Sequence, residues 1–246
     1  MRLLVFDGDE ATAQQAAALI ASKAREAIAA RGRACLALSG GRTPWIMMRA
    51  LATQELSWGD VHIFQADERV APPGSADRTL THLREALLSH APLPPEHVHP
   101  MPVDDDDLVA AAQRYEATLK QVAGTPPVLD LVHLGLGPDG HTASLVPGDP
   151  ALEVTAANVA ISGPYQGHRR MTLTYPILNR AETVLWLVTG AGKAEALKRL
   201  YMGDTGIPAG RVRRDRAVIL ADRLATSLLA ERADEGGKTK SSGPGN

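Results

Sequence analysis

One loop of the sequence places a histidine and an aspartate among closely spaced glycines. Asp139 and His141 lie within the segment GLGPDGHTAS, which spans residues 135–144. A histidine, with an ordinary pKa of about 6.5, is the usual general base at neutral pH, and a carboxylate beside it can orient its imidazole. Glycines permit positive φ angles and close backbone approach. The pattern therefore indicates a general base, although a histidine that merely caps the following helix would look the same locally.

A second glycine-containing turn could bind an anion. The segment SGGRTP, residues 39–44, follows an apolar run and precedes a helical pattern. Free N–H groups and the dipole at a helix N-terminus attract anions, and glycines let a phosphate come close. Ser39 and Thr43 add hydroxyls, and Arg42 adds a positive charge. The sequence favours a phosphate site over an ordinary turn, but it lacks the spacing and the Lys-Ser/Thr pair of nucleotide-hydrolysing loops.

Four further charged residues lie near the predicted ends of strands. Asp67 and Arg69 follow an apolar run, where a carboxylate and a guanidinium could orient hydroxyls and clamp an anion. A solvated strand end would show the same residues. Arg170 precedes an apolar segment, and Lys193 opens a helix after the glycine-rich residues 189–192. Both could be surface charges, but Lys193 is better placed to contact a phosphate.

The sequence predicts neither a metal ion nor an organic cofactor. The pattern GxGxxG occurs at residues 135–140, but it comes late in the chain and no long helix follows it, which argues against a dinucleotide. We expect His97 and His99 to be solvated loop residues rather than a metal pair. Four consecutive aspartates at 104–107 cannot all face one ion. Cys35 is the only cysteine, which excludes a multi-cysteine zinc site and suggests a reducing compartment.

Strand and helix patterns alternate along the chain. We predict strands over residues 3–6, 34–38, 61–66, 129–134, 154–161, 171–174, 183–188 and 217–220. We predict helices over residues 10–31, 44–52, 79–88, 108–122, 192–201 and 224–232. This alternation is typical of a Rossmann-like α/β fold, a mostly parallel sheet with helices on both faces. Ligands bind such sheets at the carboxyl ends of the strands, so the segments described above should meet at one edge.

Length and composition limit the classes of protein to consider. The 246 residues are 44% apolar and 22% charged, with a net charge of -2. We expect one α/β domain over residues 1–232 and a disordered Gly, Lys, Ser and Pro tail over 233–246. The lack of a basic surplus argues against nucleic acid, and no apolar run reaches the roughly 18 residues of a membrane span. Early acidic residues disfavour a signal peptide, so we expect a cytoplasmic protein.

Four motifs together resemble one family. SGGRTP at 39–44, DERV at 67–70, GLGPDGHTASL at 135–145 and RMTLT at 170–174 have the order and approximate spacing seen in 6-phosphogluconolactonases. The resemblance implies a fold shared with glucosamine-6-phosphate deaminases and ribose-5-phosphate isomerases. It also implies a monomer that hydrolyses 6-phosphoglucono-δ-lactone in the oxidative pentose phosphate pathway, without a metal or organic cofactor. One departure is Arg78-Thr79, where the family usually has Ser-Asn.

The resemblance also assigns roles to individual residues. His141 would take a proton from the water that attacks the lactone C1 carbonyl, and Asp139 would help to position it. Asp67 and Arg69 would orient sugar hydroxyls and the developing carboxylate. The 6-phosphate would be bound by Ser39, Gly40, Gly41, Arg42, Thr43, Arg170 and Lys193.

Two other functions occur on related folds. The related amino-sugar-phosphate deaminases usually have a glutamate five residues after the motif histidine, but this chain has Val146, which cannot orient an imidazole. A non-catalytic sugar-phosphate sensor should carry a DNA-binding module, for which the chain offers no spare segment or basic helix. Because Asp67 and His141 are both present, we predict a lactonase rather than a deaminase or a sensor.

Overall fold

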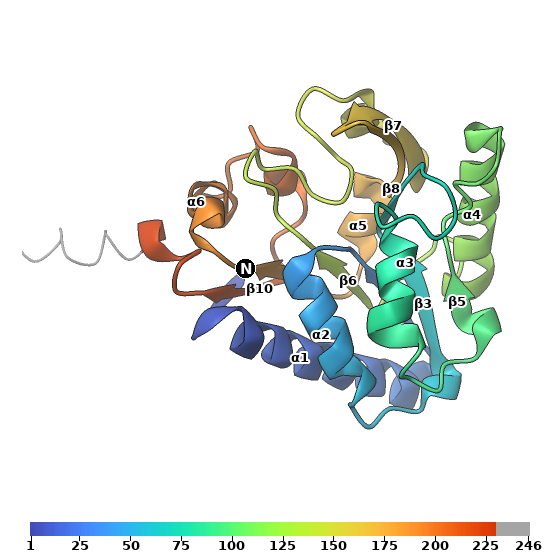
Figure 1. The fold of residues 1–246 in the computed structure, drawn as a ribbon, viewed down its shortest axis with the longest axis horizontal. Helices are drawn as coiled ribbons and strands as arrows, with labels where there is room; N and C mark the ends of the chain where they lie inside the picture. The colour runs from blue at the N-terminus through green and yellow to red at the C-terminus, as the bar shows by residue number, and fades with distance from the viewer. Residues whose placement is uncertain (230–246) are drawn as a thin grey trace, which may run out of the picture.

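The computed structural model describes residues 1–229 (Figure 1). The domain boundary predicted at residue 232 and the tail predicted over 233–246 lie outside these residues. The helix predicted over 224–232 is described only in part: residues 223–226 form a turn and residues 227–229 are helical.

Seven strands form one sheet in the order β1-β10-β9-β6-β2-β3-β5, and every neighbouring pair is parallel. The strands are β1 (Arg2–Phe6), β2 (Ala34–Leu38), β3 (Val61–Gln65), β5 (Val98–His99), β6 (Leu131–Leu134), β9 (Val184–Val188) and β10 (Ala217–Asp222). The central strands β2, β6 and β9 are buried at every residue. Such continuous apolar strands are expected where helices cover both faces of a parallel sheet, so the predicted fold class is confirmed.

Helices pack on the two faces of this sheet. The helices are α1 (Gly8–Arg31), α2 (Arg42–Ala52), α3 (Thr79–Leu83, continued by a π-helical turn over Arg84–Leu88), α4 (Leu108–Ala123), α5 (Tyr175–Arg180) and α6 (Ala194–Met202). The first three contribute to one buried apolar cluster and the last three to another. In Figure 1, α1 and α2 lie along one side of the sheet, and α4 and α5 lie on the other.

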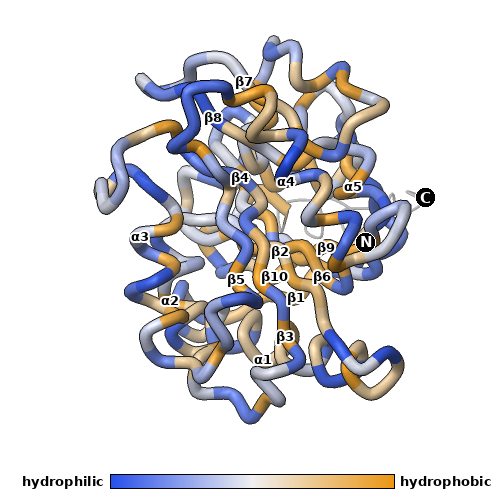
Figure 2. Tube along the Cα trace, turned by 90° about the vertical axis from the view of Figure 1, so that its right-hand side faces the viewer, coloured by the Kyte–Doolittle hydropathy of each residue, from blue (hydrophilic) through white to orange (hydrophobic). Residues whose placement is uncertain are grey.

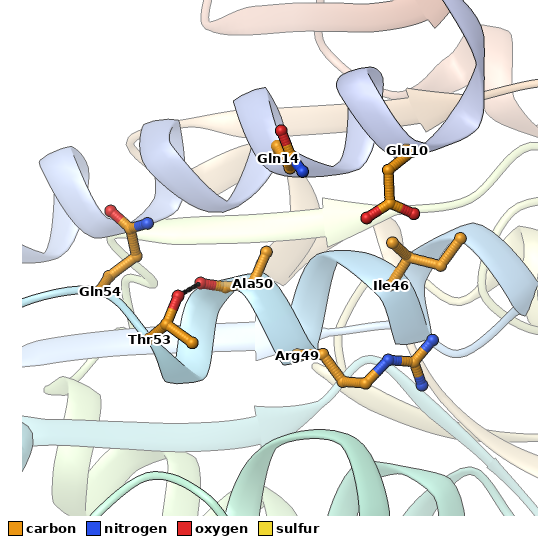
Figure 3. Close-up of a pocket in the computed structure, with 7 residues that line it drawn as sticks. All are labelled: Glu10, Gln14, Ile46, Arg49, Ala50, Thr53 and Gln54. Carbon is orange, nitrogen blue, oxygen red and sulfur yellow. Dashed lines mark hydrogen bonds between the residues drawn. The ribbon is translucent and has the colours of Figure 1, made fainter.

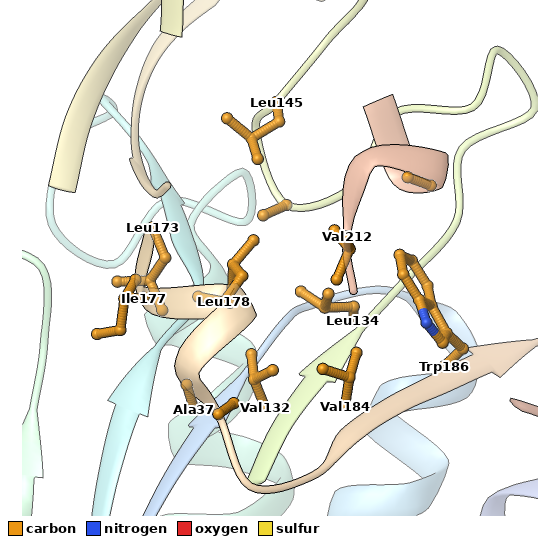
Figure 4. Packing of buried hydrophobic residues seen from close by; sticks show 14 of the residues in the cluster. Ala37, Val132, Leu134, Leu145, Leu173, Ile177, Leu178, Val184, Trp186 and Val212 are labelled. Atoms are coloured by element: carbon orange, nitrogen blue, oxygen red, sulfur yellow. The ribbon is translucent and has the colours of Figure 1, made fainter. Parts of the chain in front are cut away.

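The larger core lies between the sheet and the helices α4, α5 and α6. In it, Val132 and Leu134 of β6 lie beside Leu178 of α5, and Trp186 of β9 belongs to the same cluster (Figure 4). All four side chains are fully buried. Burying one large apolar side chain stabilises the fold by about 1.5–3 kcal/mol. The hydropathy colouring of Figure 2 shows the same interior, with apolar residues along the central strands. This packing holds the strand ends, and therefore the site, in place.

A separate antiparallel sheet was not predicted. It has the order β4-β8-β7 and consists of β4 (Asp67–Arg69), β8 (His168–Leu173) and β7 (Val159–Tyr165). A two-residue turn joins β7 to β8, and both turn residues, Gln166 and Gly167, have positive φ angles of 51° and 84°. This is the type I′ geometry that suits a tight hairpin. Parts of β7 and β8 were predicted as strands, but their pairing was not. The short, charged strand β4 was not predicted as a strand of its own, and it pairs with β8, far away in the sequence.

Three other expectations need correction. The strand predicted over 154–161 begins only at Val159, because Pro150–Glu153 forms a 3-10 turn. Helix α5 was not predicted, since its six residues, two of them fully buried, are too few to show a helical period. Likewise, β5 lies within a segment that we expected to be a loop.

Candidate active site

The residues predicted for the site surround one cavity of about 530 Å³ at the carboxyl ends of β2, β6 and β9. Along the sheet, the chain runs from β2 outward to β3 and β5, whereas β6, β9 and β10 lie on the other side of β2. The cavity therefore lies where the strand order reverses, the usual ligand position in such folds. The predicted residues that line it are Ser39, Gly40, Gly41, Arg42, Thr43, Asp67, Arg69, His141, Arg170 and Lys193.

Asp139 does not line the cavity but contacts His141. Its Oδ1 lies 2.6 Å from Nδ1 of His141 and also accepts the backbone N–H of His141 at 3.2 Å. Burial alone would raise the pKa of Asp139, but the hydrogen bonds and charge of His141 outweigh it and hold that pKa below its usual range. An ionised Asp139 accepts a hydrogen bond from Nδ1–H. The proton of the neutral imidazole is therefore on Nδ1, and Nε2 keeps the lone pair that a general base needs.

Gly137 provides the space for this pair of side chains. A Cβ atom at Gly137 would lie 2.0 Å from Nδ1 of His141 and 2.6 Å from Oδ1 of Asp139. The loop is closed by a 2.8 Å hydrogen bond from the Gly137 N–H to the His141 carbonyl. Gly140 has a φ of 83°, and a Cβ there would lie 2.5 Å from that of Ile207. Gly137 is therefore required by contact, and Gly140 by contact as well as by backbone conformation.

The predicted anion turn links β2 to α2. Gly41 is the N-cap residue of α2, and no side chain within residues 1–229 caps that end. The Ser39 hydroxyl is buried and has no hydrogen-bond partner in the described part of the chain. A buried hydroxyl left unpaired costs about 1–3 kcal/mol, so this one indicates room for a polar ligand group. Thr43 Oγ1 lies 2.6 Å from Oγ1 of Thr189 at the end of β9.

Two arginines face each other across the small sheet. Arg69 of β4 is paired with Arg170 of β8, and Asp67 precedes Arg69 by two residues on the same strand. Like charges directly opposite one another are destabilising, so this pairing is typical of an anion site. Burial lowers the pKa of Arg170, and the negative charge of Asp67 opposes that shift. Asp67 also accepts a 2.7 Å hydrogen bond from the Ser144 hydroxyl, which fixes its carboxylate beside the arginines.

Lys193 reaches the cavity from the turn that follows β9. The N–H of Gly190 lies 3.0 Å from both carboxylate oxygens of Asp222, and one of these also accepts the Ala225 N–H at 2.7 Å. Asp222 therefore anchors the turn. Burial lowers the pKa of Lys193, and the charge of Asp139 opposes the change. Lys193 and His141 line the same cavity, so the ammonium group and the histidine loop belong to one site.

Arg42 differs from the other predicted residues. Its side chain is 83% exposed and pairs with Asp9 at 3.2 Å.

Arg78 and Thr79, which stand where Ser-Asn is usual in the family, have different environments. Arg78 is buried and its Nε lies 3.8 Å from Glu68, whereas Thr79 lines the cavity. Glu68 itself accepts the backbone N–H groups at the start of α3, so it is structural.

Several residues of the site were missed in the sequence. Thr189 and Asp222 lie at the carboxyl ends of β9 and β10, where the strand-end rule would have located them. Ser144 lies inside the predicted loop. Tyr165, which contacts Asp139, comes from the unpredicted hairpin and gave no sequence signal.

A second hollow lies between α1 and α2 (Figure 3). Its lining residues are Glu10, Gln14, Ile46, Arg49, Ala50, Thr53 and Gln54. It includes none of the residues predicted for chemistry and lies away from the strand ends. The Thr53 hydroxyl is already satisfied, because it donates to the Ala50 carbonyl at 2.8 Å. The cavity at the strand ends is therefore the candidate active site.

His97 and His99 are not the solvated loop residues that we expected. They form a partly buried cluster with His62, whose ring centroid lies 4.0 Å from that of His97 and 5.3 Å from that of His99. Burial and the neighbouring imidazoles lower the pKa of His99 to about 4. Among residues 1–229, no group of three or more His, Cys, Asp or Glu side chains is arranged to hold a metal ion.

Comparison with known proteins identifies the family. Residues 7–220 match the sequence model of the glucosamine-6-phosphate isomerases/6-phosphogluconolactonase family. The chain belongs to this family. A 6-phosphogluconolactonase of Synechocystis sp. is 42% identical over 192 residues, which cover 76% of this chain and 80% of that protein. One of Mycobacterium tuberculosis is 41% identical over 217 residues, covering 82% and 88%.

A solved structure shows the same fold. The 6-phosphogluconolactonase of Thermotoga maritima superposes with a TM-score of 0.80 at 27% identity, covering 90% of this chain and 98% of that one.

In the described residues, none of the helices combines the length and apolar character that crossing a membrane requires.

Proposed function

We propose that this protein hydrolyses 6-phospho-D-glucono-1,5-lactone to 6-phospho-D-gluconate, the second step of the oxidative pentose phosphate pathway. The observation that carries the proposal is the pairing of His141 with Asp139 at a cavity that also holds Arg69, Arg170 and Lys193. A general base beside a group of cations suits water attack on a substrate that bears a phosphate. Its relatives named 6-phosphogluconolactonase support the same activity.

His141 acts as the general base in the proposed mechanism. Its Nε2 removes a proton from water as the water oxygen bonds to the lactone C1 carbonyl carbon. The tetrahedral intermediate then breaks the bond between C1 and the ring oxygen, and the proton on Nε2 passes to that oxygen. Asp139 accepts the hydrogen bond from Nδ1–H of His141 throughout, and its negative charge stabilises the imidazolium. General base catalysis contributes about 10²–10⁴-fold, which suits a lactone that already hydrolyses readily.

The other charged residues bind and orient the substrate. We assign the 6-phosphate to the turn over residues 39–43 together with Arg170 and Lys193. Backbone N–H groups at the start of α2 and two cations are the donors that a phosphate needs. Asp67 and Arg69 orient the sugar hydroxyls and the developing carboxylate. The exposed Arg42 contributes long-range attraction rather than a direct contact.

A deaminase is the closest alternative. At the position of the glutamate that orients the deaminase histidine, this chain has Val146, which is buried and apolar. Here the partner of the imidazole is Asp139, which precedes His141 instead of following it. We therefore favour the lactonase.

We further propose that residues 1–232 act as one domain and as a monomer in the cytoplasm. The cavity draws residues from Ser39 to Lys193, so the site is built by nearly the whole fold. A phosphorylated sugar does not cross membranes unaided, which favours the compartment where it is made.

The decisive test supplies fresh substrate. 6-Phosphogluconolactone is generated in situ, and its disappearance with and without the protein is followed by NMR. We expect hydrolysis well above the spontaneous rate, and no ammonia from glucosamine 6-phosphate. A rate equal to the spontaneous one, or release of ammonia, would contradict the proposal.

A further inference from the structure

Tyr165 lies outside the lining of the cavity but contacts the residues that the proposed function uses. Its hydroxyl lies 3.2 Å from Oδ2 of Asp139 and 3.4 Å from Nδ1 of His141. Its ring meets the imidazole edge to face, with 5.2 Å between ring centroids and an interplanar angle of 64°. No motif of the sequence marks this residue, and the mechanism above does not require it.

The two oxygens of the Asp139 carboxylate have different partners. Oδ1 accepts the side-chain and backbone N–H groups of His141. Oδ2 accepts the Tyr165 hydroxyl. Because the carboxylate is held at both oxygens, it cannot rotate about its Cβ–Cγ bond without losing a hydrogen bond. The imidazole that depends on Oδ1 is fixed as a consequence.

Tyr165 is also in contact with the arginine pair. The Arg170 guanidinium carbon lies 5.2 Å from the centre of the Tyr165 ring, within the range of a cation–π interaction. Nη2 of Arg170 donates to the Tyr165 carbonyl at 3.2 Å. Tyr165 therefore contacts two parts of the site: the histidine loop through its hydroxyl, and Arg170 of strand β8 through its ring and carbonyl.

The hairpin gives Tyr165 a fixed place. Tyr165 ends β7 and pairs with His168, the first residue of β8. The positive φ angles of Gln166 and Gly167 define a tight turn directly after it. The tyrosine thus stands on a short, regular hairpin rather than on a long loop.

We propose that Tyr165 is a positioning residue that holds the Asp139 carboxylate and the Arg170 guanidinium in their working geometry. The kinetic part of this inference rests on the proposed lactonase function. Because the hydroxyl contacts Asp139 and the ring contacts Arg170, removing the hydroxyl and removing the ring should have different effects on the kinetics.

Two variants separate these contacts. Tyr165→Phe removes only the hydroxyl, so we expect kcat for the phosphorylated lactone to fall about fivefold with little change in KM, the loss expected for one hydrogen bond. Tyr165→Leu removes the ring as well, so KM should also rise by about three- to tenfold as Arg170 loses its support. Tyr201→Phe, at an exposed tyrosine on α6, is the matched control and should match wild type.

A substrate-free measurement tests the inference independently of the proposed function. The Asp139 carboxyl group is titrated by ¹³C NMR in the wild type, Tyr165→Phe and Tyr201→Phe. We expect its pKa to rise in Tyr165→Phe alone, since a donor to the charged form is lost. An unchanged Asp139 titration in that variant overturns the role of Tyr165, whatever the enzyme's activity. A wild type without lactonase activity would instead overturn the proposed function and leave this titration to decide the role of Tyr165.

Discussion

The backbone N–H of Ser39 donates a hydrogen bond to Nδ1 of His133, 3.3 Å away. His133 lies inside β6 and is fully buried, and burial lowers its pKa to about 3. The first residue of the anion turn is therefore attached to an imidazole that must stay neutral, because a protonated Nδ1 could not accept this bond.

This burial makes stability depend on pH. Above the ordinary histidine pKa of about 6.5, His133 is neutral in both the folded and unfolded states. As the pH falls from there toward 3, the unfolded chain binds a proton that folded His133 does not. The free energy of unfolding therefore decreases, with a slope of up to about 1.4 kcal/mol per pH unit for each such histidine.

His133→Asn should reduce that slope between pH 6 and pH 4, because the group that titrates only in the unfolded state is gone. Urea denaturation across this range measures it. His90→Gln, at an exposed histidine, is the control and should keep the wild-type slope. An unaltered slope in His133→Asn would show that His133 does not govern acid sensitivity. The partly buried His62 and His99, whose pKa values are also lowered, would then be the candidates.

Gly137→Ala should inactivate the enzyme while the protein stays folded. The new Cβ would occupy the place of the imidazole, 2.0 Å from Nδ1, so His141 must move. A displacement of about 1 Å can cost about 100-fold in rate, and we expect at least that loss in kcat/KM. The control is Gly59→Ala, since a Cβ at Gly59 meets nothing within 4 Å. Activity within threefold of wild type in Gly137→Ala would mean that His141 need not lie where it does.

The fold follows from local patterns far more completely than the site does. Strand β2 lies where a continuous apolar run predicts it, because helices cover both faces of the sheet there. Helix α4 lies where apolar residues at helical spacing predict it, because it buries one face against the sheet. Strands were predicted over parts of β7 and β8, but they stop short of Tyr165 and Arg170, and the sheet that the two strands form with β4 was not predicted. Strand β4 pairs with β8, which lies far away in the sequence, and no local period encodes that pairing. The same limit applies to Glu68, which is fully buried and accepts the backbone N–H groups at the start of α3, a contact that no local pattern indicates.

Lys193→Ala should weaken binding of the phosphorylated substrate selectively. A charged hydrogen bond to phosphate contributes about 1.5–3 kcal/mol, so KM for 6-phosphogluconolactone should rise at least about tenfold. KM for unphosphorylated glucono-δ-lactone should change far less. Lys198→Ala, on helix α6 directly after the turn that carries Lys193, is the control. Equal effects of Lys193→Ala on both lactones would contradict a phosphate contact.

Removal of metal ions should leave the activity unchanged. In the proposed mechanism the nucleophile is a water molecule activated by His141, in place of the metal-bound water of metallohydrolases. Protein treated with EDTA and checked by metal analysis should hydrolyse fresh lactone at the untreated rate. Loss of activity that only a divalent ion restores would require His141 to be reinterpreted as a metal ligand.

The most direct measurement compares kcat of His141→Asn and wild type on 6-phosphogluconolactone generated in situ, after correction for spontaneous hydrolysis. Asparagine keeps most of the side-chain volume and can still donate to Asp139, but it cannot accept a proton from water. We expect kcat to fall by about 10²–10⁴-fold, with the circular dichroism spectrum unchanged. Turnover close to wild type in His141→Asn would contradict general base catalysis by the histidine of this loop.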